Sequence, residues 1–258
     1  MLPNILAGLR SDDCVLVMDA DSQCSDQFVE TALTAMATTA GIGAVGGVFY
    51  GQPGHALIGQ LQRNEYVRYA RAISRRGARA LALTGTGTLF RVAALRRVAA
   101  CRGKSLPGRA GQVCDTLSLA EDNEMTLALK TLGYDCRSPR NCRVTTEIMP
   151  DLLSLWRQRI RWQHGAPENL RHYGLKRVAL AQRMPMELWG SPEVVPAIGS
   201  PPQIHRTCPM VVVQTGRAQA SSIGTAAIGL NTPRPERRVR WLKIEEPPTG
   251  SARASRER

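Results

Sequence analysis

The sequence predicts an α/β fold, because short apolar runs typical of buried strands alternate with longer amphipathic segments typical of helices. The clearest strand lies at residues 14–18, where an apolar run is followed directly by polar residues. Residues 42–50 and 81–90 are the next two expected strands. In open α/β sheets, ligands bind where buried strands deliver polar residues at their carboxyl ends. We therefore expect a mixed, mostly parallel sheet with a ligand site at one edge.

Apolar residues at helical spacing identify the segments between these strands. The expected helices cover residues 25–37, 56–76, 92–100, 122–132 and 152–163. Residues 102–112 are basic and glycine-rich without periodicity, which predicts a flexible loop.

The composition changes near residue 177, beyond which prolines interrupt every long segment. We expect a folded domain over residues 1–177 and a Pro/Arg-rich, low-order tail over residues 178–258. The abrupt change would also suit a shifted reading frame, a hypothesis that the nucleotide sequence around codon 177 could refute.

The 258 residues carry a formal net charge of +13. A basic surface favours polyanionic partners such as nucleic acid, nucleotide diphosphates or anionic lipid headgroups, without choosing among them. The seven cysteines form no C-x-x-C pair and do not fall at zinc-ligand spacing with the four histidines, so no zinc site is expected. An odd cysteine count without a signal peptide predicts reduced thiols and a cytoplasmic location. Residues 31–62 lack charged side chains, but Gly51 to Gly54 divides them, so we expect no transmembrane helix.

Two aspartates, Asp19 and Asp21, follow the first strand. Side chains two residues apart in an extended chain point the same way. Such a pair can hold Mg²⁺ or Mn²⁺ while the metal bridges a diphosphate. Alternatively, the aspartates cap a turn by accepting hydrogen bonds from backbone amides. Both interpretations stay open at this point.

A second acidic pair, Glu121 and Asp122, stands at an expected helix start, where the helix dipole favours carboxylates. The pair could also supply a general base that takes a proton from an attacking hydroxyl. Further along, Arg161 offers a planar fork for phosphate oxygens and Trp162 a flat face for a sugar or base ring. The helix could also lie at a membrane interface, and both interpretations could hold together. The Thr/Gly repeat at residues 84–88 lacks the ending of a P-loop, so it is a strand bend or a glycine turn that lets a substrate approach the backbone.

Taken together, these motifs resemble the family 2 glycosyltransferases, in particular the processive branch that holds cellulose, chitin, hyaluronan and poly-N-acetylglucosamine synthases. The resemblance covers about residues 3–175 and rests on residues 17–22, 84–91, 121–122 and the Gln158-x-x-Arg161-Trp162 pattern. It implies a nucleotide-diphospho-sugar transferase fold. It also implies a metal-assisted, inverting enzyme that builds a β-linked polysaccharide by moving a hexose or N-acetylhexosamine from a UDP-sugar.

The resemblance implies a role for each motif residue. Asp19 and Asp21 would contact the UDP diphosphate and its Mg²⁺ or Mn²⁺, with Asp21 as the direct ligand. Asp122 would be the base that activates the acceptor hydroxyl, supported by Glu121. The residues implied at the acceptor end, the pyrophosphate and the acceptor path are Thr84, Gly85, Thr86, Gln158, Arg161 and Trp162.

The sequence departs from this family pattern in two places. The family begins with a strand and an Asp-rich turn that hold uracil and ribose, whereas residues 3–9 resemble the segment after them. The family also carries membrane helices after the Arg-Trp motif, whereas this chain continues into its Pro/Arg-rich tail. We therefore expect an incomplete, N-terminally truncated fold.

The expected partners are a UDP-sugar donor and a glycan acceptor, with peripheral contact to the cytoplasmic face of the membrane. The alternative is an inactive remnant that acts at most as a binding or membrane-peripheral protein. A nucleic-acid partner is supported only by charge, because the chain has no recognisable binding module.

Overall fold

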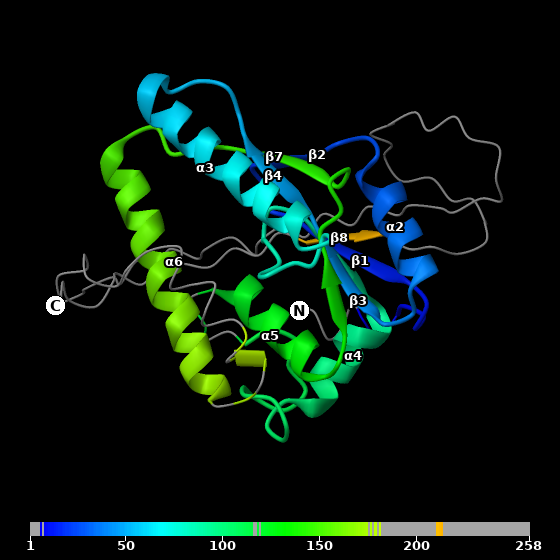
Figure 1. Cartoon of the computed structure of the whole chain (residues 1–258). Helices are drawn as coiled ribbons and strands as arrows, with labels where there is room; N and C mark the ends of the chain where they lie inside the picture. Colours follow the sequence, from blue (N-terminus) through cyan, green and yellow to red (C-terminus); the bar gives the residue numbers. More distant parts are fainter. Residues whose placement is uncertain are drawn as a thin grey trace, which may run out of the picture.

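The computed structural model describes residues 6, 8–115, 118, 120–174, 176, 178–179, 181 and 210–213 (Figure 1). The named elements, in chain order, are β1 (Cys14–Val17), β2 (Ser22–Cys24), α2 (Phe28–Thr38), β3 (Ile42–Gly46), β4 (Val48–Gly51), α3 (Ala56–Arg75), β5 (Thr88–Arg91), α4 (Val92–Cys101), α5 (Glu121–Thr131), β6 (Asp135–Arg137), β7 (Arg143–Thr146), α6 (Leu152–Tyr173) and β8 (Met210–Val213).

The central sheet has the strand order β6-β3-β5-β1-β8. The α/β class and the mixed sheet are therefore confirmed. The expectation of mostly parallel pairing is wrong, because only β3 and β6 pair in parallel while the other three pairings are antiparallel. The reason lies in the return of the chain after α3. Thr88, the first residue of β5, pairs with Gly46, the last residue of β3, so β5 starts where β3 ends and runs back against it.

The single strand expected at residues 42–50 is in fact two strands, β3 and β4. They separate at Gly47, and β4 joins β7 and β2 in a second, three-stranded sheet of order β2-β7-β4. A Cβ atom at Gly47 would lie 2.4 Å from Cγ2 of Val144. Only glycine therefore lets the chain pass from one sheet to the other at this point.

The two faces of the central sheet bury alternate residues of β1, as the period of two in a strand requires. Val15 belongs to the core cluster that includes residues of α4 and α5, whereas Leu16 belongs to the cluster that includes Phe28 and Met36 of α2. Figure 1 shows α2 on one side of the sheet and α4 on the other. Burial on both faces explains why residues 14–17 are uniformly apolar.

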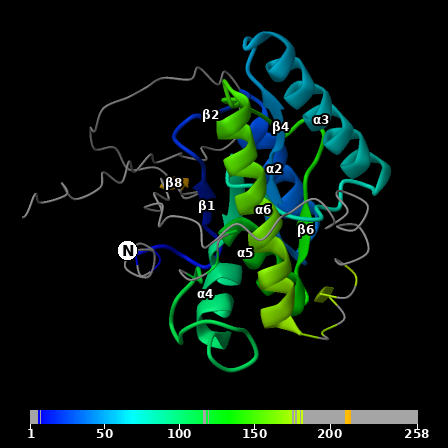
Figure 2. The same ribbon diagram turned by 90° about the vertical axis from the view of Figure 1, so that its left-hand side faces the viewer.

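The helix α6 extends ten residues beyond the end expected at residue 163. It begins after Asp151, whose side chain accepts a 2.8 Å hydrogen bond from the Ser154 backbone. Pro167 lies inside the helix and removes one backbone donor. Buried contacts of Leu170 and Tyr173 with the core stabilise the helix past the proline. Figures 1 and 2 both show α6 beside α5.

The other expected helices are present, and none of their ends is shifted by more than three residues. Of the third expected strand, residues 81–90, only the part within β5 is a strand, and residues 81–87 form turns, bends and irregular structure. Most of the tail expected at residues 178–258 lies outside the described residues. Its described part includes β8, which pairs antiparallel with β1. No described helix combines the length and the apolar character that a membrane span needs.

Candidate active site

Backbone groups of one glycine connect the two acidic motifs. The backbone N–H of Asp19, just beyond β1, donates to the Gly85 carbonyl at 3.0 Å. The backbone N–H of Gly85 in turn donates to Oδ2 of Asp122 at 3.3 Å. A Cβ atom at residue 85 would lie 3.2 Å from Oδ2 of Asp19, so the loop lies close against that carboxylate. Three motifs spread over about a hundred residues of sequence therefore meet at one place.

Charged side chains of both acidic motifs and of the Arg-Trp motif shift the pKa of Asp19. Its pKa is raised to about 6, first by burial and then by the negative charges of Asp21 and Asp122, with a smaller contribution from Glu121. The positive charge of Arg161 opposes the rise. Because the interaction between two charges declines with distance, the predicted acidic residues and Arg161 lie close enough to Asp19 to shift its pKa.

Asp122 lies in the first turn of α5, and two backbone amides hold its carboxylate. Oδ1 accepts from the Asn123 N–H at 2.7 Å, and Oδ2 accepts from Gly85. The side chain keeps exposed surface, yet the atoms packed around it raise the pKa of its carboxyl through desolvation, against the lowering effects of these amides and of Arg161. An oriented carboxylate of raised pKa that still reaches solvent is suited to accept a proton.

Two residues outside the predicted set of site residues, Glu65 and Arg159, contact each other beside the tryptophan. Nη2 of Arg159 lies 2.6 Å from Oε2 of Glu65 on α3, and the Arg159 guanidinium carbon lies 4.5 Å from the centroid of the Trp162 ring. Arg159 stands three residues before Trp162 and so shares its face of α6. This spacing of three residues could have linked Arg159 to Trp162 from the sequence. The ion pair of Arg159 with Glu65 on α3 could not be found without the tertiary structure.

The remaining predicted residues lie on α6 and on the loop before β5. Oε1 of Gln158 is buried and has no hydrogen-bond partner in the structure. A buried acceptor without a partner needs an explanation, and a bound ligand would supply one. The hydroxyls of Thr84 and Thr86 lie 2.9 Å apart on the loop that carries Gly85. The threonines therefore lie at the bridge between the acidic motifs.

The carboxylates of Asp19 and Asp21 suit a divalent metal ion, but a substrate would have to supply further ligands. Within the described ranges, no group of three or more His, Cys, Asp or Glu side chains is placed to hold a metal. Asp19 and Asp21 offer oxygen ligands of the kind that Mg²⁺ and Mn²⁺ prefer. The repulsion that raises the pKa of Asp19 would be relieved by a bound cation. The residues therefore fit a metal whose other ligands are water and diphosphate oxygens.

A family model described as "Glycosyl transferase family group 2" matches residues 14–198. No curated protein matches the chain. Among solved structures, one match is the mannosyltransferase PcManGT from Pyrobaculum calidifontis, in complex with GDP-Man and Mn²⁺. The two share 16% sequence identity with a TM-score of 0.44. The match covers 66% of this chain and 41% of that enzyme, so the chain spans about two fifths of its length.

Proposed function

The chain belongs to glycosyl transferase family group 2, and from this membership we propose that it transfers a sugar from a nucleotide-sugar donor to a glycan acceptor. The observation that carries the proposal is the Gly85 bridge, in which the Gly85 carbonyl holds the Asp19 backbone and the Gly85 N–H holds the Asp122 carboxylate. The more specific form of the proposal takes a UDP-sugar carrying a hexose or N-acetylhexosamine as donor, a β-linked polysaccharide as product, and inversion at the anomeric carbon.

In the proposed reaction, Asp122 accepts the proton of an acceptor hydroxyl. The hydroxyl oxygen forms a bond to the anomeric carbon of the donor sugar as the bond from that carbon to the diphosphate breaks. The nucleoside diphosphate leaves with the electron pair of the broken bond. A single displacement of this kind inverts the anomeric configuration. The raised pKa of Asp122 favours its role, because a base with a pKa nearer neutrality accepts a proton more readily.

The other residues would bind and orient the substrates. Arg161 brings a planar positive group that can pair with phosphate oxygens, and the Trp162 ring can pack against a sugar. Gln158 would accept a hydrogen bond from the acceptor end through its buried Oε1. Asp19 and Asp21 would hold Mg²⁺ or Mn²⁺, which would neutralise the charge that develops on the leaving diphosphate.

Calorimetric titration of UDP with and without Mn²⁺ tests the proposed function. We expect the metal to increase UDP affinity and Asp21→Ala to abolish that increase, because Asp21 is the proposed direct ligand. Asp26→Ala is the matched control, since it removes an exposed carboxylate five residues away, outside the site. GDP is titrated in parallel, because the proposed site residues would contact the diphosphate and the sugar, so they do not distinguish uracil from guanine. Without metal-dependent binding of either nucleotide, the competing proposal of a non-catalytic family member would replace this one.

An exposed apolar surface favours the further proposal of peripheral contact with the cytoplasmic face of a membrane. It is formed by the first turns of α3 and α6, which the Gln62 side chain brings together through hydrogen bonds in both directions with the Met149 backbone, at 2.9 and 3.0 Å. Leu152 is 76% exposed and Leu57 is 74% exposed. The other exposed members are Leu61, Leu153 and Trp156. Apolar side chains gathered on adjacent helix ends suit insertion at the headgroup level.

Co-sedimentation with anionic lipid vesicles tests this contact. Replacing both Leu152 and Leu153 by Glu should lower vesicle binding at least about tenfold, because buried apolar area and attraction to anionic lipid both decrease. The control replaces Leu57 and Leu61 by Ala, which shrinks the surface without adding charge and should have a smaller effect. Equal binding of wild type and the double Glu variant would contradict membrane contact through this surface.

A further inference from the structure

The motif residues of α6 lie on a part of the helix that has no fully buried residue. Gln158, Arg161 and Trp162 stand in its first three turns, whereas its buried residues all come later, at Gly165, Asn169, Leu170 and Tyr173. A helix is held in place chiefly by the face that it buries. The position of the motif over the rest of the site therefore depends on how this later part of α6 is attached.

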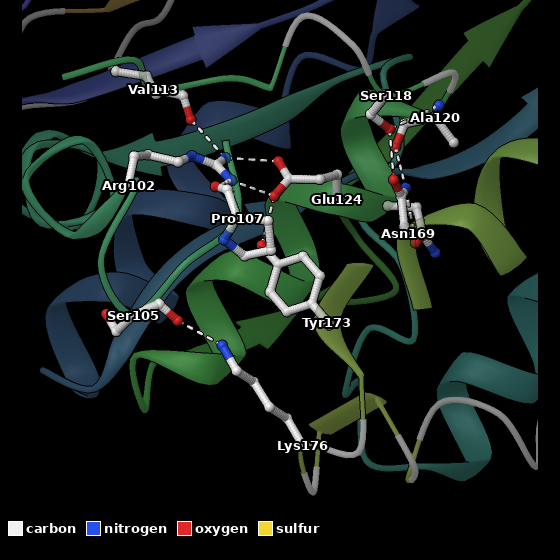
Figure 3. Close-up of polar contacts among 11 residues, drawn as sticks. Arg102, Ser105, Pro107, Val113, Ser118, Ala120, Glu124, Asn169, Tyr173 and Lys176 are labelled. Atoms are coloured by element: carbon white, nitrogen blue, oxygen red, sulfur yellow. Dashed lines mark hydrogen bonds and ion pairs between the residues drawn. The ribbon is translucent and has the colours of Figure 1, made fainter. Parts of the chain in front are cut away.

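Asn169 attaches α6 to the start of α5, as Figure 3 shows. The side chain is 1% exposed. Its Nδ2 donates to the Ala120 carbonyl at 2.9 Å and to Oδ1 of Asn123 at 3.4 Å, while its Oδ1 accepts from the Ser118 hydroxyl at 2.7 Å. The same hydroxyl accepts from the Ala120 N–H at 3.2 Å. Asn169 thus holds the residues on both sides of the Glu121–Asp122 pair.

One turn later, Tyr173 makes a second connection to the same helix. Its hydroxyl donates to the Glu124 carboxylate, which is also paired with Arg102 (Figure 3). Burial, followed by the charge of Glu124, raises the pKa of Tyr173, so its hydroxyl stays protonated and remains a donor. Three of the four hydrogen bonds of Asn169 and Tyr173 reach the start of α5, at its N-cap residue Ala120 and at Asn123 and Glu124 in its first turn. The fourth reaches Ser118, just before the helix.

We propose that Asn169 is a positioning residue that fixes Asp122 on α5 relative to Arg161 and Trp162 on α6. Asn169 acts through the backbone and side-chain groups that flank Glu121 and Asp122. Its role in positioning Asp122 for the reaction rests on the proposed function. An apolar residue could bury as much surface at this position, but it could not specify one register between the two helices. Register matters because a misplacement of about 1 Å can cost about 10²-fold in rate.

The test compares Asn169→Ala with Leu170→Ala. Both variants truncate a buried residue of the same turn, but only the first removes the polar contacts to α5. We expect Asn169→Ala to lower kcat for transfer about 100-fold with the donor KM within about threefold of wild type. Leu170→Ala should retain kcat within about threefold at a temperature where circular dichroism shows both variants folded. A folded Asn169→Ala protein of near-normal kcat, or an equal loss in Leu170→Ala, would overturn the proposal.

A second measurement does not depend on catalysis. Amide hydrogen exchange in residues 120–126 should be at least about tenfold faster in Asn169→Ala than in wild type, with exchange in α2 unchanged. Unchanged exchange in residues 120–126 would overturn the proposal whether or not sugar is transferred. If exchange accelerates in the variant while wild type transfers no sugar from any donor, the attachment of α5 by Asn169 is supported and the proposed function fails.

Discussion

Asp122→Asn is expected to lower kcat for sugar transfer by about 10²- to 10⁴-fold. The asparagine side chain has nearly the same shape, and its oxygen can still accept from the Asn123 or Gly85 amide. It cannot take up a proton from the acceptor hydroxyl at neutral pH. Initial rates with a labelled nucleotide sugar measure the loss, and calorimetry on the same preparation should show nucleoside-diphosphate binding close to that of wild type.

Two companion variants separate the base from its surroundings. Glu121→Gln removes the neighbouring carboxylate, which has only a supporting role in the proposal, and should cost less than about tenfold. Asp26→Asn changes an exposed carboxylate outside the site and should leave the rate unchanged. If Asp122→Asn retained more than a tenth of the wild-type rate, the proton acceptor would have to be another group.

The pH dependence of the wild-type rate follows from the same carboxylates. Asp122 and Asp19 both act in their ionised forms, one as base and the other toward metal and diphosphate. Burial raises the pKa of Asp122, and burial with neighbouring negative charge raises that of Asp19 to about 6. Raised values mean that protonation begins nearer neutrality, so at a metal concentration too low to saturate the site kcat/KM should decline as the pH falls through about 6. A profile at that metal concentration that stayed flat from pH 7 down to pH 5 would contradict ionised Asp19 as a participant.

The residues that sequence could identify are those in short local patterns. Asp19 and Asp21 follow an apolar strand, and Arg161 and Trp162 lie in a five-residue motif, so each pattern is visible in a single window of sequence. The helices could be predicted for a similar reason, because the period of 3.6 residues in their apolar positions is visible within a short stretch of sequence. The α/β class followed from the alternation of these segments.

What sequence could not provide depends on contacts between distant segments. Gly85 connects Asp19 to Asp122 through its backbone, and a glycine in a Thr/Gly repeat carries no sign of its partners. The antiparallel insertion of β5 depends on where the chain returns after α3, which no local pattern encodes. The division of β3 from β4 depends on the close approach of Val144 to Gly47, almost a hundred residues apart.

The glycine-rich, basic segment at residues 102–112 shows most clearly how tertiary contacts change a local prediction. Its composition predicts a flexible loop, yet Arg102 is fully buried and donates to the backbone carbonyls of Pro107 and Val113, each at 2.9 Å. The guanidinium also pairs with both carboxylate oxygens of Glu124, one of them at 2.6 Å (Figure 3). One arginine therefore organises the loop around itself and ties it to α5.

This organisation gives a large expected effect on stability. Arg102→Met should lower the free energy of unfolding by about 3–5 kcal/mol, because it leaves the buried Glu124 carboxylate without its positive partner. The same change also removes the donors to both loop carbonyls. Urea denaturation followed by circular dichroism measures the difference. The control is Arg137→Met, which breaks a partly exposed pair with Asp135 and should cost about 0–1 kcal/mol.

The double variant Arg102→Met/Glu124→Met distinguishes the cost of an unpaired charge from the cost of losing the loop contacts. If most of the effect comes from the stranded carboxylate, removing both charges should recover the greater part of the loss, since buried ion pairs can often be replaced by apolar residues. If the double variant is as unstable as Arg102→Met, the energy lies instead with the carbonyls of Pro107 and Val113 or with the Tyr173 hydroxyl, which loses its acceptor when Glu124 is replaced. A single Arg102→Met variant no less stable than Arg137→Met would show that neither contact holds this loop.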